Sequence, residues 1–265
     1  MLDDVLPNIS CDTRSATHTP VEPCDLPDDL QLVFVDDRDR RRTLALEDAA
    51  VLDFGMAKAF RKPPAYRGQR NFPGWWWSAT TRSHVVYGSW LERHHIIEAD
   101  RDARVVAILG RPFELTWPEG KEQVGHVPDL LCRMLEGQVV VIDCHSVSRT
   151  NEKFRRKAAV TAAACSQIGW DYRLVGEPDP VWGANLRWLA GYRHPRFGDE
   201  HLEEVLVSLF ATAQPLSAAR QAGDPIRVRP VLFHLLWRGR LSADLGLPLG
   251  ETTILTACAD PVGAA

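Results

Sequence analysis

The chain has 265 residues, of which 45% are hydrophobic and 25% are charged. This composition is typical of a globular protein and excludes a disordered or fibrous one. The length allows one large domain or two domains of modest size. No stretch approaches the roughly 20 apolar residues of a membrane helix, and the first residues lack both the basic and the apolar part of a secretory signal. We therefore expect no membrane partner and a cytoplasmic location.

Cysteine and histidine spacing does not favour a zinc site. The six cysteines are scattered, and no two of them form a Cys-x-x-Cys pair, so we expect free thiols. His94 and His95 are adjacent, and we expect their side chains to point to different faces of a helix. A hydrolase that holds a metal through His94, His95 or His126 is a remote alternative, because no helical His-Glu-x-x-His pair is present.

Charge is distributed unevenly along the chain. The first 50 residues contain 12 acidic and 5 basic side chains, whereas residues 51–83 contain six basic side chains and one acidic one. An acidic leader followed by a basic segment indicates a surface that binds a polyanion. The alternative is a solvated loop whose charge is incidental.

The first part of the chain contains few regular elements. Residues 30–35 read as a strand, and residues 43–52 as a strand or a short helix. Pro and Gly deny regular structure to residues 62–74, which we expect to form an extended arm. Apolar residues at helical spacing predict a helix over residues 83–98.

The middle of the chain reads as a helix, four strands, a second helix and a last strand, which predicts an α/β fold class. The last of four predicted strands is almost wholly apolar and is typical of a strand buried on both faces. Gly169 ends the second predicted helix, as a glycine after a helix commonly does. The predicted strands cover residues 104–109, 111–117, 126–134 and 138–143, followed by a helix over 151–168 and a strand over 170–175.

Helices over residues 180–191, 199–213 and 230–238, followed by two short apolar runs, predict a smaller, mostly helical, winged-helix-like C-terminal domain. The sequence thus divides into three parts. Residues 1–57 form an acidic N-terminal leader with a short strand region, and residues 58–178 and 179–265 form two domains.

Three acids are predicted to meet at the rim of the sheet. Glu92 lies in the first predicted helix, Asp129 follows Pro128 within a predicted strand, and Asp143 ends the buried apolar run. Converging carboxylates repel one another unless they are protonated or bridged by a divalent cation. Oxygen ligands select Mg²⁺, with Mn²⁺ as a possible substitute. The alternatives are a solvated helix acid for Glu92 and a loop-capping acid for Asp143.

Two basic groups are candidate DNA contacts. Arg67 and Arg70 lie in the arm among aromatic residues. Basic side chains bind the phosphates of DNA, and aromatic rings can stack on exposed nucleotides. We expect at least two of the three tryptophans Trp75–Trp77 to pack on the core instead. The second group opens the helix over 151–168 and equally reads as a solvated helix turn; its members are Lys153, Arg155, Arg156 and Lys157.

The chain resembles the TnsA-like endonuclease subunits of heteromeric transposases, chiefly the actinobacterial branch. Short motifs in a fixed order carry the resemblance over roughly residues 66–255. They are Tyr66–Thr81, Ser89–Arg93, Gly110–Phe113, His126–Asp129, Val140–Asp143, Gly169–Arg173, Trp188–Arg196 and Leu232–Arg238.

The resemblance implies a restriction-endonuclease-like mixed sheet core with flanking helices over residues 58–178. It implies that Glu92 is the helix acid, Asp129 the central metal ligand and Asp143 the acid of an acid-x-Lys pair. Position 145, where lysine is expected, holds His145, which supplies little positive charge at neutral pH. Lys153 or Lys157 is the candidate to reach in from the following helix.

The implied function is a Mg²⁺-dependent endonuclease that cuts the 5′ strand at transposon ends during DNA transposition. The implied partners are double-stranded DNA, a DDE-type (TnsB-like) transposase subunit and an AAA+ (TnsC-like) regulator, and the implied location is the cytoplasmic nucleoid. The replacement by His145 motivates the alternative, a catalytically inactive TnsA-like subunit that binds DNA or assists assembly.

Overall fold

The computed structural model describes residues 18–50, 57–61, 67–69, 71–146 and 150–258. Its contacts divide the chain between Pro178 and Asp179 into two compact units, which are described separately. The strands of residues 18–45 belong to the sheets of the larger unit. Arg70 lies outside the described residues.

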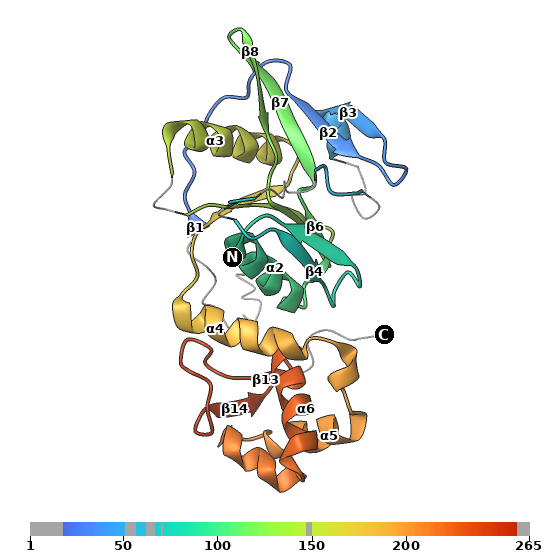
Figure 1. Ribbon diagram of the computed structural model, residues 1–265, viewed down its shortest axis with the longest axis vertical. Helices are drawn as coiled ribbons and strands as arrows, with labels where there is room; N and C mark the ends of the chain where they lie inside the picture. The colour runs from blue at the N-terminus through green and yellow to red at the C-terminus, as the bar shows by residue number, and fades with distance from the viewer. Residues whose placement is uncertain (1–17, 51–56, 62–66, 70, 147–149, 259–265) are drawn as a thin grey trace, which may run out of the picture. The chain divides into compact units, whose positions relative to one another are not determined.

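A five-stranded sheet forms the centre of the larger unit (Figure 1). Its neighbouring strands are antiparallel except for β10 and β11, which run parallel. A parallel pair requires a crossover, and α3 (Glu152–Gln167) supplies it. The strand order is β1 (His18–Thr19), β11 (Asp171–Val175), β10 (Val139–Cys144), β9 (Leu130–Met134) and β6 (Val105–Gly110).

Local sequence fixes both ends of α3. The Asn151 side chain caps the helix by accepting a 2.9 Å hydrogen bond from the Phe154 N–H. Gly169 follows the helix with a φ of +74°, a conformation that glycine adopts without strain. The helix predicted over residues 151–168 is therefore confirmed.

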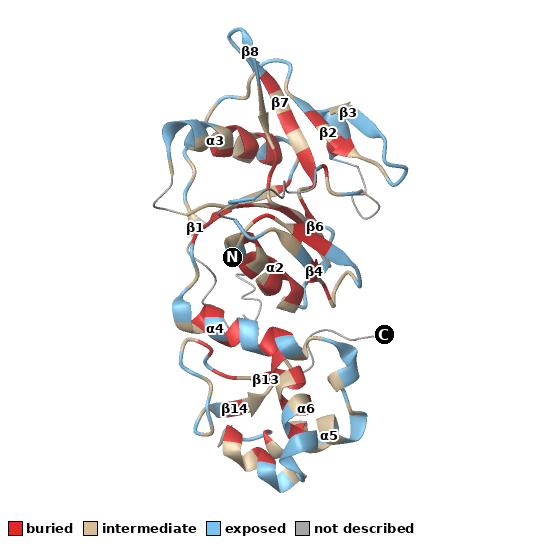
Figure 2. Ribbon diagram, in the orientation of Figure 1, coloured by how far each residue is buried: buried red, intermediate tan, exposed pale blue. Residues whose placement is uncertain are grey.

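A second, antiparallel sheet packs with α3 and the central sheet around the hydrophobic core. Strand β7 alternates, so that Phe113, Leu115 and Trp117 are each 1% exposed (Figure 2). These residues cluster with Val141 of β10 and Val160 of α3. The strand order is β3 (Arg41–Ala45), β2 (Gln31–Val35), β7 (Phe113–Glu119) and β8 (Glu122–His126), and the short helix α1 (Leu46–Ala49) follows β3.

The helix predicted over residues 83–98 is wrong at its start. A hairpin of β4 (Gly74–Trp77) and β5 (His84–Tyr87) occupies this region, and α2 (Trp90–Arg101) begins after it. Ser89 caps α2 by accepting a 3.1 Å hydrogen bond from the Glu92 N–H. Val86 and Trp90 are spaced like helix neighbours, but the buried β-branched pair Val85-Val86 belongs to the hairpin. In Figure 1, α2 and α3 lie on opposite faces of the central sheet.

The single strand predicted over residues 126–134 is two strands. Strand β8 ends at His126 and β9 begins at Leu130. Pro128 between them has no N–H to give to a sheet ladder. Asp129 therefore lies in the bend before β9 rather than within a strand.

The smaller unit contains helices and one small antiparallel sheet. Its third helix begins at Pro225, earlier than the predicted residue 230, because Asp224 caps it and Pro225 takes its first position. The helices are α4 (Pro180–Leu189), α5 (Glu200–Leu209) and α6 (Pro225–Trp237), with 3₁₀ turns at Ala190–Tyr192, Pro195–Phe197 and Leu216–Ala222. The sheet order is β12 (Gln214–Pro215), β14 (Ile254–Ala257) and β13 (Leu241–Ser242).

The described structure is thus mixed α/β with several antiparallel sheets. None of the helices in the described ranges combines the length and apolar character needed to cross a bilayer.

Candidate functional site

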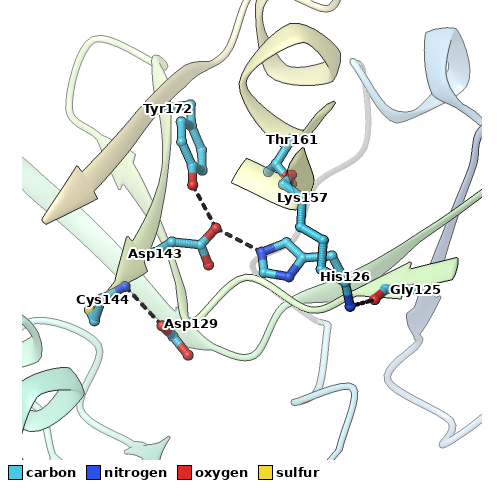
Figure 3. A network of polar contacts seen from close by, with 8 residues as sticks. All are labelled: Gly125, His126, Asp129, Asp143, Cys144, Lys157, Thr161 and Tyr172. Carbon is cyan, nitrogen blue, oxygen red and sulfur yellow. Dashed lines mark hydrogen bonds and ion pairs between the residues drawn. The ribbon is translucent and has the colours of Figure 1, made fainter. Parts of the chain in front are cut away.

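Asp143 is a buried acid held by residues from two sheets. It lies near the end of β10 and is 1% exposed. Its Oδ2 accepts a 2.7 Å hydrogen bond from the Tyr172 hydroxyl and lies 2.7 Å from His126 Nε2 (Figure 3). Tyr172 stands on β11, next to β10, whereas His126 ends β8 of the other sheet. Burial and the Asp143 charge raise the pKa of Tyr172, which keeps its proton and donates.

Asp129 lies within the electrostatic reach of the other two predicted acids. Its Oδ2 accepts a 2.8 Å hydrogen bond from the Cys144 N–H, one residue beyond Asp143 (Figure 3). Burial raises the pKa of Asp129 well above its ordinary value, and the charges of Glu92 and Asp143 raise it further. The negative charges of Glu92 and Asp143 therefore favour a proton or a cation at the Asp129 carboxyl group.

Glu92 is turned back over the start of α2. Its Oε2 accepts a 2.6 Å hydrogen bond from the Gly88 N–H and lies 3.3 Å from an Arg111 guanidinium nitrogen. A Cβ at Gly88 would stand 2.3 Å from that guanidinium, so glycine permits the close approach. Glu92 is 7% exposed, which excludes the solvated helix acid considered above.

Arg111 is a member of this site to which the sequence analysis gave no role. Besides its contact with Glu92, its backbone N–H donates a 2.8 Å hydrogen bond to the Asp129 carbonyl. Its φ of +53° is uncommon for a residue other than glycine. The nearby Arg111 charge lowers the Asp129 pKa, although burial and the two acids outweigh it. Gly110, which separates two predicted strands just before Arg111, was the available signal.

The His145 side chain packs against an aromatic ring of α3. Its ring stacks on Phe154 of α3, with 3.7 Å between centroids and 11° between planes. Its Nε2 is buried and has no hydrogen-bond partner among the described residues. Its backbone N–H donates to the Val175 carbonyl at 2.9 Å. The side chain at the predicted lysine position therefore packs against the start of α3.

Lys157 of α3 reaches the end of β8, next to His126. Its Nζ donates a 2.6 Å hydrogen bond to the carbonyl of Gly125, the residue before His126 (Figure 3). Burial lowers the Lys157 pKa, and the charges of Lys153 and Arg61 lower it further. Lys157 thus stands at the flank of the Asp143 contact.

The other predicted DNA contacts are on the surface. Lys153, Arg155 and Arg156 are exposed at the start of α3, where Arg155 pairs with Glu152 at 3.1 Å and Arg156 with Glu119 at 3.4 Å. Arg67 is also exposed.

Exposed aromatic rings lie beside α2. Phe72 is 60% exposed and Trp90 56%, with ring centroids 6.0 Å apart, and Trp75 is 54% exposed. Trp76 is buried, and its Nε1–H donates a 2.9 Å hydrogen bond to Asp100. The Arg93 guanidinium lies about as far from the Trp76 ring as from the Trp90 ring, at 5.0 and 5.1 Å. Of the three consecutive tryptophans, one is fully buried and one is plainly solvent-exposed.

The expectation that His94 and His95 diverge is wrong. Both approach Glu98, which follows one helical turn later and lies between them. Burial alone would raise the Glu98 pKa, but the two histidines outweigh it and lower the pKa to about 2. Among the described residues, these three form a group whose potential ligand atoms all lie within 4.8 Å of one another. Glu92, Asp129 and Asp143 are also among the described residues, but their potential ligand atoms do not all lie within 4.8 Å of one another.

Chemically, the site combines two buried acids, Glu92 and Asp143, and the half-buried Asp129 with one arginine, one histidine and one lysine at its edge. Such a group has an excess of carboxylate oxygens, which suits a hard divalent cation. The contact of Arg111 with Glu92 partly balances the negative charge of the acids. A scan against protein-family models finds no match for this chain, and a search of curated proteins finds no significantly similar sequence.

Proposed function

We propose that the protein is a Mg²⁺-dependent DNA endonuclease, a TnsA-like subunit of a heteromeric transposase. In this proposal the larger unit is a restriction-endonuclease-like domain and the smaller one is winged-helix-like. The observation that carries the proposal is Asp129, a half-buried acid that accepts a 2.8 Å hydrogen bond from the Cys144 N–H beside Asp143 and whose pKa is raised by desolvation and by the charges of Glu92 and Asp143. Acids that repel one another in a buried position gain stability when a cation binds between them.

Asp129 and Asp143 are the residues that would hold Mg²⁺ or Mn²⁺, with Glu92 as the third acid. A bound divalent cation supplies positive charge at the scissile phosphate and activates water for hydrolysis. Tyr172 and His126 orient Asp143, as partners of a ligating carboxylate commonly do. Arg111 offsets part of the charge of Glu92.

Lys157 is the candidate to supply the charge that His145 lacks. The Lys157 Nζ is partly buried beside the strand that carries His126, and a cation near the reacting phosphate stabilises the charge that develops there. Arg111 is a second cation, already in contact with Glu92.

DNA would approach across the exposed basic side chains and aromatic rings of the larger unit. Lys153, Arg155 and Arg156 supply contacts to phosphates. The exposed rings of Phe72 and Trp90 offer surfaces on which nucleotides stack. The transposon end, a DDE-type transposase and an AAA+ regulator are the proposed partners, which follow from the motif resemblance.

The test is a calorimetric titration of Mn²⁺ and Mg²⁺ into the wild-type chain and the variants Asp129→Asn and Asp48→Asn. Asp48 is exposed on α1 and serves as the matched control. Saturable binding that disappears only in Asp129→Asn is expected. The same variants are then assayed for nicking of transposon-end DNA with the transposase subunit added. Nicking that is unchanged in Asp129→Asn would defeat the assignment.

The second candidate is a catalytically inactive subunit that binds DNA or assists assembly. The stacking of His145 on Phe154 favours it, because the predicted lysine position then contributes no cation to the reaction. His145→Lys distinguishes the two candidates. Nicking that appears only in this variant supports the inactive subunit, whereas nicking by the wild-type chain supports the endonuclease.

A further inference from the structure

A second cluster of potential ligands lies further along α2 from Glu92. His94 Nε2 is 3.2 Å from Glu98 Oε1, and His95 Nδ1 is 2.7 Å from Glu98 Oε2. The two imidazoles are 4% and 3% exposed, and their ring centroids are 5.2 Å apart at 80°. Two nitrogen donors and one carboxylate thus face one point inside the larger unit.

The hydrogen bond of His95 fixes which nitrogen faces that point. His95 Nε2 lies 2.9 Å from the Gly176 carbonyl oxygen. A carbonyl only accepts, so Nε2 carries the hydrogen, and in the neutral ring Nδ1 presents its lone pair toward Glu98. A histidine that donates one N–H to a backbone carbonyl and directs the other nitrogen inward is the usual arrangement of a metal ligand.

In the described part of the chain, the ring nitrogens of His94, unlike those of His95, are not satisfied by hydrogen bonds. Neither of its ring nitrogens has a hydrogen-bond partner among the described residues, and both are buried. A proton shared between His95 and Glu98 would satisfy those two groups and leave His94 with only the 3.2 Å contact of its Nε2 with Glu98 Oε1. Buried polar atoms without hydrogen bonds are costly, and one cation between the three side chains would give His94 Nε2, His95 Nδ1 and the Glu98 carboxylate a common partner.

We propose that His94, His95 and Glu98 bind one transition-metal ion of the Zn²⁺ class. Two imidazoles and a carboxylate form a known zinc ligand set, and a water completes four-coordination. Imidazole nitrogen suits zinc and its neighbours, whereas Mg²⁺ prefers oxygen alone. The ion would fasten α2 through His95 to Gly176, which directly follows β11. It is separate from the carboxylate site of Glu92, Asp129 and Asp143 and does not depend on the proposed nuclease activity.

The experiment uses the chelator-treated full chain, titrated with Zn²⁺ by calorimetry and with Co²⁺ by visible absorption. We expect about one equivalent of Zn²⁺ per chain and a four-coordinate Co²⁺ spectrum. Glu98→Gln, which keeps the shape and removes the charge, should weaken Zn²⁺ binding by more than about 100-fold, beyond the loss typical of an outer-shell partner. His201→Gln, at an exposed histidine of α5, should bind Zn²⁺ like the wild type.

Asp129→Asn separates the two sites. It should keep Zn²⁺ binding whether or not the carboxylate site binds Mn²⁺. X-ray absorption of the Zn²⁺-loaded wild type needs no variant and should report two imidazole ligands, which decides the question even where Glu98→Gln does not fold. The proposal is overturned by no saturable Zn²⁺ binding, by another imidazole count, or by equal affinity in wild type and folded Glu98→Gln.

Discussion

Tyr172 and Asp143 are joined by a 2.7 Å hydrogen bond between neighbouring parallel strands of the central sheet. The same carboxylate oxygen lies 2.7 Å from His126, so one oxygen of Asp143 is engaged twice. The orientation of the carboxylate therefore depends on two partners, the phenol of Tyr172 and the imidazole of His126.

Tyr172→Phe is expected to keep the fold and to weaken Mn²⁺ binding about 10–100-fold, as the loss of an outer-shell partner commonly does. The ring remains, and only the donor to Asp143 is removed. Calorimetric affinity is the measurement. Tyr192→Phe, in the smaller unit, is the matched control and should leave the affinity unchanged; equal affinities in both variants would remove Tyr172 from the site.

Gly110→Ala is expected to destabilise the larger unit. A Cβ at Gly110 would lie 2.2 Å from the Val86 carbonyl oxygen, which is backbone and cannot rotate away. The β4–β5 hairpin would have to move relative to β6. Chemical denaturation should show a lower free energy of unfolding, whereas Gly191→Ala, with no atom within 4 Å of the added Cβ, should unfold close to wild type.

Leu115→Ala is expected to lower the free energy of unfolding by about 2–5 kcal/mol, the range typical of a buried leucine truncated to alanine. Leu115 is 1% exposed in the core beneath β7. Leu135, which is 57% exposed, supplies the control, and Leu135→Ala should stay within about 0.5 kcal/mol of wild type. A similar loss in both variants would contradict the core described above.

His234 makes the stability of the smaller unit sensitive to acid. Burial lowers its pKa below the ordinary value of 6.5, although the Tyr192 carbonyl 2.7 Å from Nδ1 opposes this shift. The unfolded chain binds a proton more readily than the folded one, so the stability linked to His234 is present above pH 6.5 and is lost as the pH falls below it.

The melting temperature of wild type should therefore fall more steeply between about pH 7.5 and pH 5 than that of His234→Gln. His201→Gln, at an exposed histidine, should follow the wild-type curve. Parallel curves for wild type and His234→Gln would show that His234 is not the group responsible.

Periodicity and capping signals predicted much of the larger unit. The apolar run before Asp143 and the helix ended by Gly169 lie where the sequence indicated. The hairpin before α2 was missed because Val86 and Trp90 happen to match helical spacing, although a tight pair of strands buries Val85 and Val86. Short-range pattern does not distinguish these cases, since pairing with Trp75 and Trp76 decides the outcome.

The candidate site was predicted in its acids but not in their neighbours. Asp129 and Asp143 stand out in the sequence beside Pro128 and the apolar run. Tyr172 joins them through strand register, and Arg111 through a left-handed backbone conformation. The convergence of His94 and His95 on Glu98 depends on side-chain rotamers, which a helical wheel does not contain.

Asp143 and His126 belong to sheets that share no strand pairing. Their 2.7 Å contact therefore measures how closely the two sheets are packed, as well as the local chemistry. A small slide of β8 over β10 would separate them while every strand kept its backbone ladder. Metal affinity should accordingly fall when the packing between the two sheets loosens, before circular dichroism detects any loss of secondary structure. The affinity of the site for metal would thus report on the packing of the core.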